Sequence, residues 1–171
     1  MEIYWLLGIP LTGGTFLGLW GSRKNAPEIN AFFSFLTLLA AAFLTYRIVD
    51  QGPMIVGEGW FFIDSFNVFL VALTAFVAFT TALFSRPYMR IEKEHGKLND
   101  KRLRLYHSSY QIFIGAMFLA LTTNNMGILW VAMEAATLAT VLLVSLYRTP
   151  ASLEAAWKYF ILCGVGIALA L

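Results

Sequence analysis

The sequence predicts an all-α integral membrane protein with about six transmembrane helices. Of its 171 residues, 59% are hydrophobic and only 13% are charged, whereas soluble domains carry about 25% charged residues. The apolar residues also come in long runs, and a membrane-spanning helix needs roughly 20 of them. So little polar surface cannot cover a globule in water, which excludes a soluble domain. The net charge of +2 gives no reason to expect a nucleic-acid partner.

Six segments are apolar enough, and long or nearly long enough, to cross a bilayer. They are residues 3–20, 29–48, 65–84, 108–123, 126–147, and a run from 150 that is still apolar at 171. The fourth segment is short. The sixth ends with no charge, aromatic anchor or polar tail, so we expect the polypeptide to continue beyond Leu171 with further helices.

Polar residues mark the boundaries between these segments. Asp64 precedes the third segment, and Thr149 with Pro150 opens the sixth, which are favoured residues at helix starts. The polar turn 122–125 predicts that the fourth and fifth helices form an antiparallel hairpin. The glycine-rich stretch 51–60 predicts a short irregular or β-hairpin excursion at the surface.

The basic residues predict the orientation in the membrane. Ten of the twelve lysines and arginines fall on loops that alternate to one side: Arg23, Lys24, Arg86, Arg90, Lys93, Lys97, Lys101, Arg102, Arg104 and Arg148. The opposite loops hold Arg47 with Asp50, Glu58 and Asp64. The positive-inside rule therefore predicts a multi-pass protein of the inner (plasma) membrane, with its N-terminus outside and its basic loops in the cytoplasm. Anionic lipid is a further candidate partner of the long basic loop.

Two charged residues lie inside apolar segments, Glu134 in the fifth and Lys158 in the sixth. Such a charge costs about 2.5 to 3.5 kcal/mol at a helix centre, so it normally faces a partner, a cavity or a polar pathway. Helical periodicity puts Glu134 on one face with Leu138 and Val141, and we expect this face to point inward. Glu134 is then either a protonatable group in a proton path or a protonated acid bonded to another helix.

Two further residues are candidates for the same path. Lys158 either takes part in it or extends its ammonium group to the cytoplasmic interface. His107, where the basic loop enters the fourth helix, is either a possible proton access point or an ordinary interfacial histidine. The single cysteine, Cys163, and the two histidines have no ligand spacing, so we expect no metal site and no cofactor in this chain. Neither a nucleophile–base pair nor a phosphate-binding loop is present, so we expect no catalytic site of its own.

The run NNMGILWVAMEAATLATVLLVSLYRTPASLEAAWKYFILCGVGIALAL, residues 124–171, resembles the antiporter-like membrane subunits. Such subunits are shared by respiratory complex I, multisubunit cation/proton antiporters and group 4 membrane-bound hydrogenases. The sequence of this run most resembles the hydrogenase 4 type. Residues 61–89 resemble the third-helix region of the same subunits. The resemblance implies a fold of about fourteen helices with two inverted repeats. Residues 1–105 would then be three N-terminal helices with a basic loop, and residues 106–171 the start of the first repeat.

The resemblance also implies a function and partners. Glu134 matches a fifth-helix glutamate that pairs with a lysine in the seventh helix, which lies outside this sequence, and Lys158 matches a lysine often seen in the sixth. The implied role is a non-catalytic subunit of an oxidoreductase complex that moves protons or Na⁺, coupled to electron transfer in other subunits. Other membrane subunits would be direct partners, and iron–sulfur or hydrogenase-like subunits indirect ones. A structural membrane anchor and a small stand-alone cation/proton transporter remain as alternatives.

Overall fold

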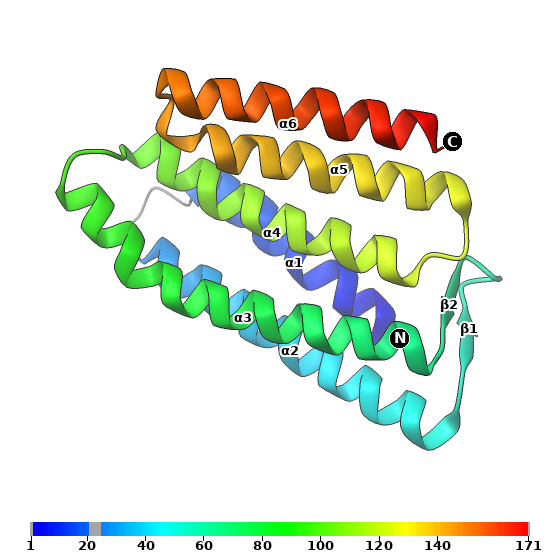
Figure 1. The fold of residues 1–171 in the computed structure, drawn as a ribbon. Coiled ribbons are helices and arrows are strands. Elements are labelled where there is room, and N and C mark those ends of the chain that lie inside the picture. Colours follow the sequence, from blue (N-terminus) through cyan, green and yellow to red (C-terminus); the bar gives the residue numbers. More distant parts are fainter. Residues whose placement is uncertain (1, 21–24, 171) are drawn as a thin grey trace.

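The computed structural model describes residues 2–20 and 25–170, which form six long helices. These are α1 (Glu2–Trp20), α2 (Ala26–Gln51), α3 (Ser65–Glu94), α4 (Asp100–Thr122), α5 (Met126–Val144) and α6 (Pro150–Leu169). A 3₁₀ turn (Ser145–Tyr147) follows α5, and two short strands, β1 (Met54–Val56) and β2 (Phe61–Ile63), lie between α2 and α3. The helices run side by side with the hairpin at one end of the bundle (Figure 1).

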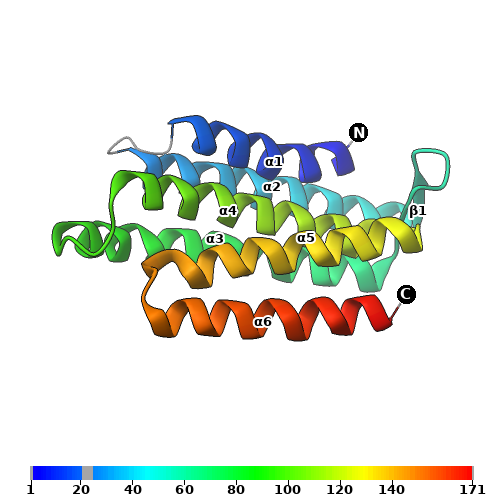
Figure 2. The same cartoon turned by 90° about the horizontal axis from the view of Figure 1, so that it is seen from above.

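The core of the bundle lies between α1, α2, α3 and α4. Its largest side chains include Leu6 of α1, Leu44 of α2 and Phe118 of α4, all fully buried. By contrast, α6 lies at the edge beside α5 in both views and buries one residue, Ala156 (Figures 1 and 2). The first four helices are therefore packed around one another, while the outer face of α6 is open.

The prediction of an all-α membrane protein is confirmed. In the described part of the chain, five helices are long and apolar enough to cross a membrane: α1, α2, α3, α5 with its 3₁₀ turn, and α6. The remaining helix, α4, has a polar first half that includes His107, Ser109 and Gln111, all buried. Its neighbours cover these side chains, because α4 packs against α1, α2, α3 and α5.

Local signals placed the starts of α3 and α6 correctly. The side chain of Asp64 accepts the Asn67 amide (2.8 Å), and Thr149 accepts the Ser152 amide (3.1 Å). The expected β-hairpin is present, with β1 antiparallel to β2. Its tip is tied to the α4–α5 turn, because the Asn124 amide donates to the Trp60 carbonyl (2.8 Å).

The basic segment between α3 and α4 differs from the predicted loop. Helix α3 continues to Glu94 and α4 begins at Asp100, so only residues 95–99 form a turn. The segment is rich in Arg, Lys and Glu, which are good helix formers, and Asn99 caps α4 by accepting the Arg102 amide (2.9 Å). The basic side chains therefore stand on two helix ends. Arg23 and Lys24 lie outside the described residues.

Acidic side chains neutralise part of this basic end. Glu28 of α2 pairs with both Arg86 and Arg90 of α3. Across the turn, Lys93 pairs with Asp100, and Lys97 with Glu92 (3.0 Å).

Candidate functional site

Glu134 lies near the middle of α5, eight residues after Met126. The inward face of α5 is formed by small residues, among them Ala132, Ala136 and Ala139, which are buried. Small residues allow a neighbouring helix to approach closely, and α5 packs against α4 and α6. Small side chains on one face leave the larger residues of α5 on the other faces.

Glu134 therefore lies on the flank of α5 and is half-buried. Leu138, one turn further on, is 45% exposed. The expectation that this face points inward is wrong for these six helices, because the residues that α5 buries are Ala132, Ala136, Thr137 and Ala139. The face that carries Glu134 is partly open.

The Glu134 side chain is unpaired inside this bundle. Among residues 2–20 and 25–170, neither a hydrogen bond nor an ion pair reaches its carboxylate, and only its backbone carbonyl accepts a bond, from Thr137 Oγ1 (2.8 Å). A carboxyl group at mid-span has no water to replace a missing partner. Within the described residues, Glu134 is thus a mid-span carboxyl group without a side-chain partner.

Lys158 lies on α6, and its side chain is 69% exposed. It pairs with Glu154, one turn earlier on the same helix. No hydrogen bond or ion pair joins Lys158 to Glu134 in the described part of the chain, so the structure does not bring the two predicted residues together.

His107 is fully buried on α4 rather than at the surface, as an ordinary interfacial histidine would be. Neither ring nitrogen has a hydrogen-bond partner among the described residues. One turn later, Gln111 Nε2 donates to Asn30 Oδ1 (2.9 Å) and Ser34 Oγ (3.0 Å) of α2. The sequence analysis missed these polar residues. The signal for them was a spacing of four residues, which puts Asn30 and Ser34 on one face of α2, and His107 and Gln111 on one face of α4.

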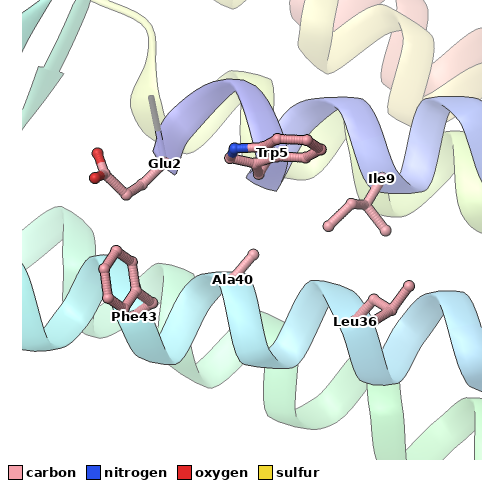
Figure 3. Close-up of a pocket in the computed structure, with 6 residues that line it drawn as sticks. All are labelled: Glu2, Trp5, Ile9, Leu36, Ala40 and Phe43. Atoms are coloured by element: carbon pink, nitrogen blue, oxygen red, sulfur yellow. The ribbon is translucent and has the colours of Figure 1, made fainter.

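A shallow groove of about 330 Å³ lies between the first half of α1 and the middle of α2. Its lining residues are Glu2, Trp5, Ile9, Leu36, Ala40 and Phe43, with side chains from both helices facing the gap (Figure 3). Glu2 pairs there with Arg47, so this ion pair joins the start of α1 to the last turns of α2. The rest of the lining is apolar and carries no group for acid–base chemistry.

Metal-binding clusters are not found in the described residues: no three His, Cys, Asp or Glu side chains are arranged to hold an ion. The candidate residues supply one carboxyl group, one imidazole and one amino group, those of Glu134, His107 and Lys158.

A curated protein and a solved structure are both similar to this chain. The sequence is 46% identical over 162 residues to the hydrogenase-4 component F homolog of Methylacidiphilum infernorum (isolate V4). The match covers 95% of this chain and 33% of that protein, so the chain spans about a third of the relative's length. No family model matches the sequence.

The fold matches a chain of the membrane-bound sulfane sulfur reductase, an archaeal respiratory membrane complex. The TM-score is 0.81 at 20% identity, over 98% of this chain and 35% of that one. Six helices in this arrangement therefore also occur as part of a longer chain in a known membrane complex. The resemblance seen in the sequence is confirmed: along 95% of its length, this chain is homologous to about a third of a hydrogenase-4 component F homolog.

Proposed function

We propose that this chain is part of an antiporter-like subunit that moves protons, or Na⁺, across the cell's inner membrane. Electron transfer in other subunits of a membrane-bound redox complex would drive the movement. The 46% identity to a hydrogenase-4 component supports the type of complex. The fold shared with a chain of a respiratory membrane complex supports the type of subunit.

One observation carries the proposal: a carboxyl group near the middle of an apolar helix that has no partner within the described bundle. Burying such a group costs several kcal/mol when it is left alone, and ionisable residues inside a membrane are functional by default. Glu134 also lies on the half-open flank of α5. That flank is accessible to a further helix bearing the lysine that the family resemblance implies.

The mechanism is electrostatic. A lysine beside Glu134 keeps the carboxylate ionised, because an opposite charge nearby favours the charged form. When that lysine loses its charge or moves away, Glu134 takes up a proton from water. Each charge that crosses the membrane works against about 2.3 kcal/mol per 100 mV, and the redox reaction supplies that work.

Two other residues have secondary roles in this proposal. Lys158 passes protons on from the Glu134 region, and His107 takes them up from the basic end of the bundle. The basic helix ends face the cytoplasm and the N-terminus faces outside, as the positive-inside rule requires. Neighbouring membrane subunits and lipid cover the open faces of α5 and α6.

The experiment replaces Glu134 by Gln in the full complex and measures proton uptake into reconstituted vesicles. Glu134→Gln keeps the shape and hydrogen-bonding capacity of the side chain but removes its titratable charge. We expect the complex to assemble and proton uptake to fall at least about tenfold, the scale expected when a proton-transfer group is lost. Glu94→Gln is the control, because Glu94 is an exposed carboxylate at the end of α3 and outside the proposed path, and it should leave uptake near the wild-type rate.

A purely structural anchor would give a different result. Glu134→Gln and Glu94→Gln would then behave alike, with intact assembly and full pumping. That outcome would reject the ion-translocating role and favour the anchor.

A further inference from the structure

A second group of polar side chains is buried between α2 and α4, apart from Glu134. We call it the polar cluster: Asn30 and Ser34 of α2 with His107 and Gln111 of α4. Each of the four is at most 1% exposed. A cluster as deeply buried as this, in a bundle otherwise filled by apolar side chains, requires partners for its polar atoms.

The protein itself supplies only some of these partners. Gln111 Nε2 donates to the Asn30 and Ser34 side chains and lies 3.2 Å from the Asn30 carbonyl oxygen. Within the described residues, Asn30 Nδ2, Gln111 Oε1 and both ring nitrogens of His107 have no partner. Buried polar atoms in native proteins are almost always bonded to protein or to ordered water. Four such atoms close together therefore indicate a ligand.

Helix geometry places His107 beside the other members of the cluster. It lies one turn before Gln111, which bonds to α2, and three residues before Tyr110, whose hydroxyl donates to the Ala78 carbonyl of α3. His107 therefore occupies the sector of α4 between α2 and α3. Arg86 of α3, eight residues beyond Ala78 toward the basic end, also has a buried nitrogen without a partner, Nε. The unsatisfied atoms thus follow one interface toward the basic end.

The chemistry of these atoms selects the ligand. The Asn30 amide nitrogen donates, the Gln111 amide oxygen accepts, and a neutral histidine ring does one of each. A metal cation requires acceptors alone, and an anion requires donors alone. Water both donates and accepts, and buried waters typically make two to four such bonds. We propose that the polar cluster binds one or more water molecules that bridge His107 to Gln111 and Asn30.

A rearrangement of side chains does not replace the water. Turning the Gln111 amide toward Asn30 Nδ2 would satisfy two of the four atoms, but the two nitrogens of His107 would keep no partner. The bound water is therefore needed chiefly as the hydrogen-bond partner of His107, and it makes this part of the bundle interior hydrated. This inference does not depend on Glu134 or on any transported ion.

The direct test is a cryo-EM map of the intact complex at a resolution that shows ordered water. We expect density within hydrogen-bond distance of His107 and of Gln111 Oε1. A map in which His107 contacts only carbon atoms or other side chains would overturn the proposal, as would a ligand with the coordination of a metal ion.

Hydroxyl-radical footprinting of the same complex gives a second measurement, because radiolysis of bound water oxidises the side chains next to it. His107 should be oxidised several-fold faster than Phe118, a fully buried residue on the same helix, after each rate is normalised to the unfolded chain. Equal rates for the two residues would reject a water site.

A pair of variants links that signal to the cluster. Gln111→Leu removes the acceptor and should lower His107 oxidation toward the rate of Phe118. Ile114→Leu, a buried apolar change one turn from Gln111, should leave it unchanged. If Gln111→Leu does not assemble, the wild-type ratio of His107 to Phe118 decides alone. Unchanged His107 oxidation in an assembled Gln111→Leu complex would contradict the proposed bridge.

Discussion

The side-chain amide of Gln111 links α4 to α2 by donating hydrogen bonds to Asn30 and Ser34. Replacing it by Ala leaves buried polar groups on α2 without their donor, which costs about 1–3 kcal/mol. We expect Gln111→Ala to lower the thermal unfolding midpoint of the detergent-solubilised protein clearly. Gln51→Ala, at the exposed end of α2, should change the stability by no more than about 0.5 kcal/mol. Equal midpoints for the two variants would show that the Gln111 bonds add nothing.

The ion pair of Lys158 with Glu154 is exposed on one helix face. Pairs of this kind, one turn apart, contribute about 0.3–0.5 kcal/mol, so Lys158→Ala should leave the unfolding midpoint nearly unchanged. Proton uptake by this variant should fall less than in Glu134→Gln, because Lys158 already has a partner. Wild-type uptake would remove Lys158 from the proposed path and leave it as an interface residue.

Single residues were predictable where they broke a pattern. Glu134 and Lys158 stand out because they are charges in apolar runs, and Asp64 because it precedes one. The direction in which Glu134 faces was not predictable, since it depends on which face of α5 packs against the neighbouring helix. His107 was noticed only as a histidine at a boundary, and its burial results from packing by helices distant in sequence.

At the scale of elements, α1 and α4 meet where a glycine allows close approach. A Cβ atom added to Gly14 would lie 3.0 Å from Ile112 Cγ1, and the Gly14 carbonyl accepts the Ser108 hydroxyl (2.8 Å). Gly14→Leu should therefore destabilise the protein by about 1–3 kcal/mol through overpacking. Gly8→Leu is the matched control in the same helix, because a Cβ there meets nothing within 4 Å. Similar thermal midpoints for both variants would mean that α1 and α4 can separate without cost.

The orientation of the helices is tested at their two ends. With Cys163 replaced by Ser, a cysteine at Lys97, in the turn between α3 and α4, should react with a membrane-impermeant reagent only from the cytoplasmic side. A cysteine at Asp50, at the exposed opposite end of α2, should react only from outside. Labelling of the Lys97→Cys protein in intact cells would overturn the proposed topology.

Helices and their caps were the most predictable features of this molecule. Apolar runs fixed the spans, and Asp64 and Thr149 fixed two starts, because both signals are local. The ends of α3 and α4 were misplaced, since hydropathy marks where a span ends and not where a charged helix ends. The first half of α4 is polar although it lies in the centre of the bundle, because its polar groups bond to α2 and to α1.

For the whole molecule, the described helices form a packed group of four, with α5 and α6 at one side. The fold shared with a respiratory membrane chain and the identity to a hydrogenase-4 component agree with the family resemblance in the sequence. The site is less complete than the fold. Glu134 has no partner among the described residues, so its proposed role requires a charge from outside this group of helices.

The most direct measurement is the initial rate of proton uptake into vesicles that contain the full complex, normalised to assembled complex. The rate should decrease in the order wild type, Glu134→Asp, Glu134→Gln. The Asp variant keeps a carboxylate but withdraws it by one methylene, while the Gln variant has none. We predict partial uptake for Glu134→Asp and a loss of at least about tenfold for Glu134→Gln. Wild-type uptake by an assembled Glu134→Gln complex would contradict this account and make Glu134 a packing residue.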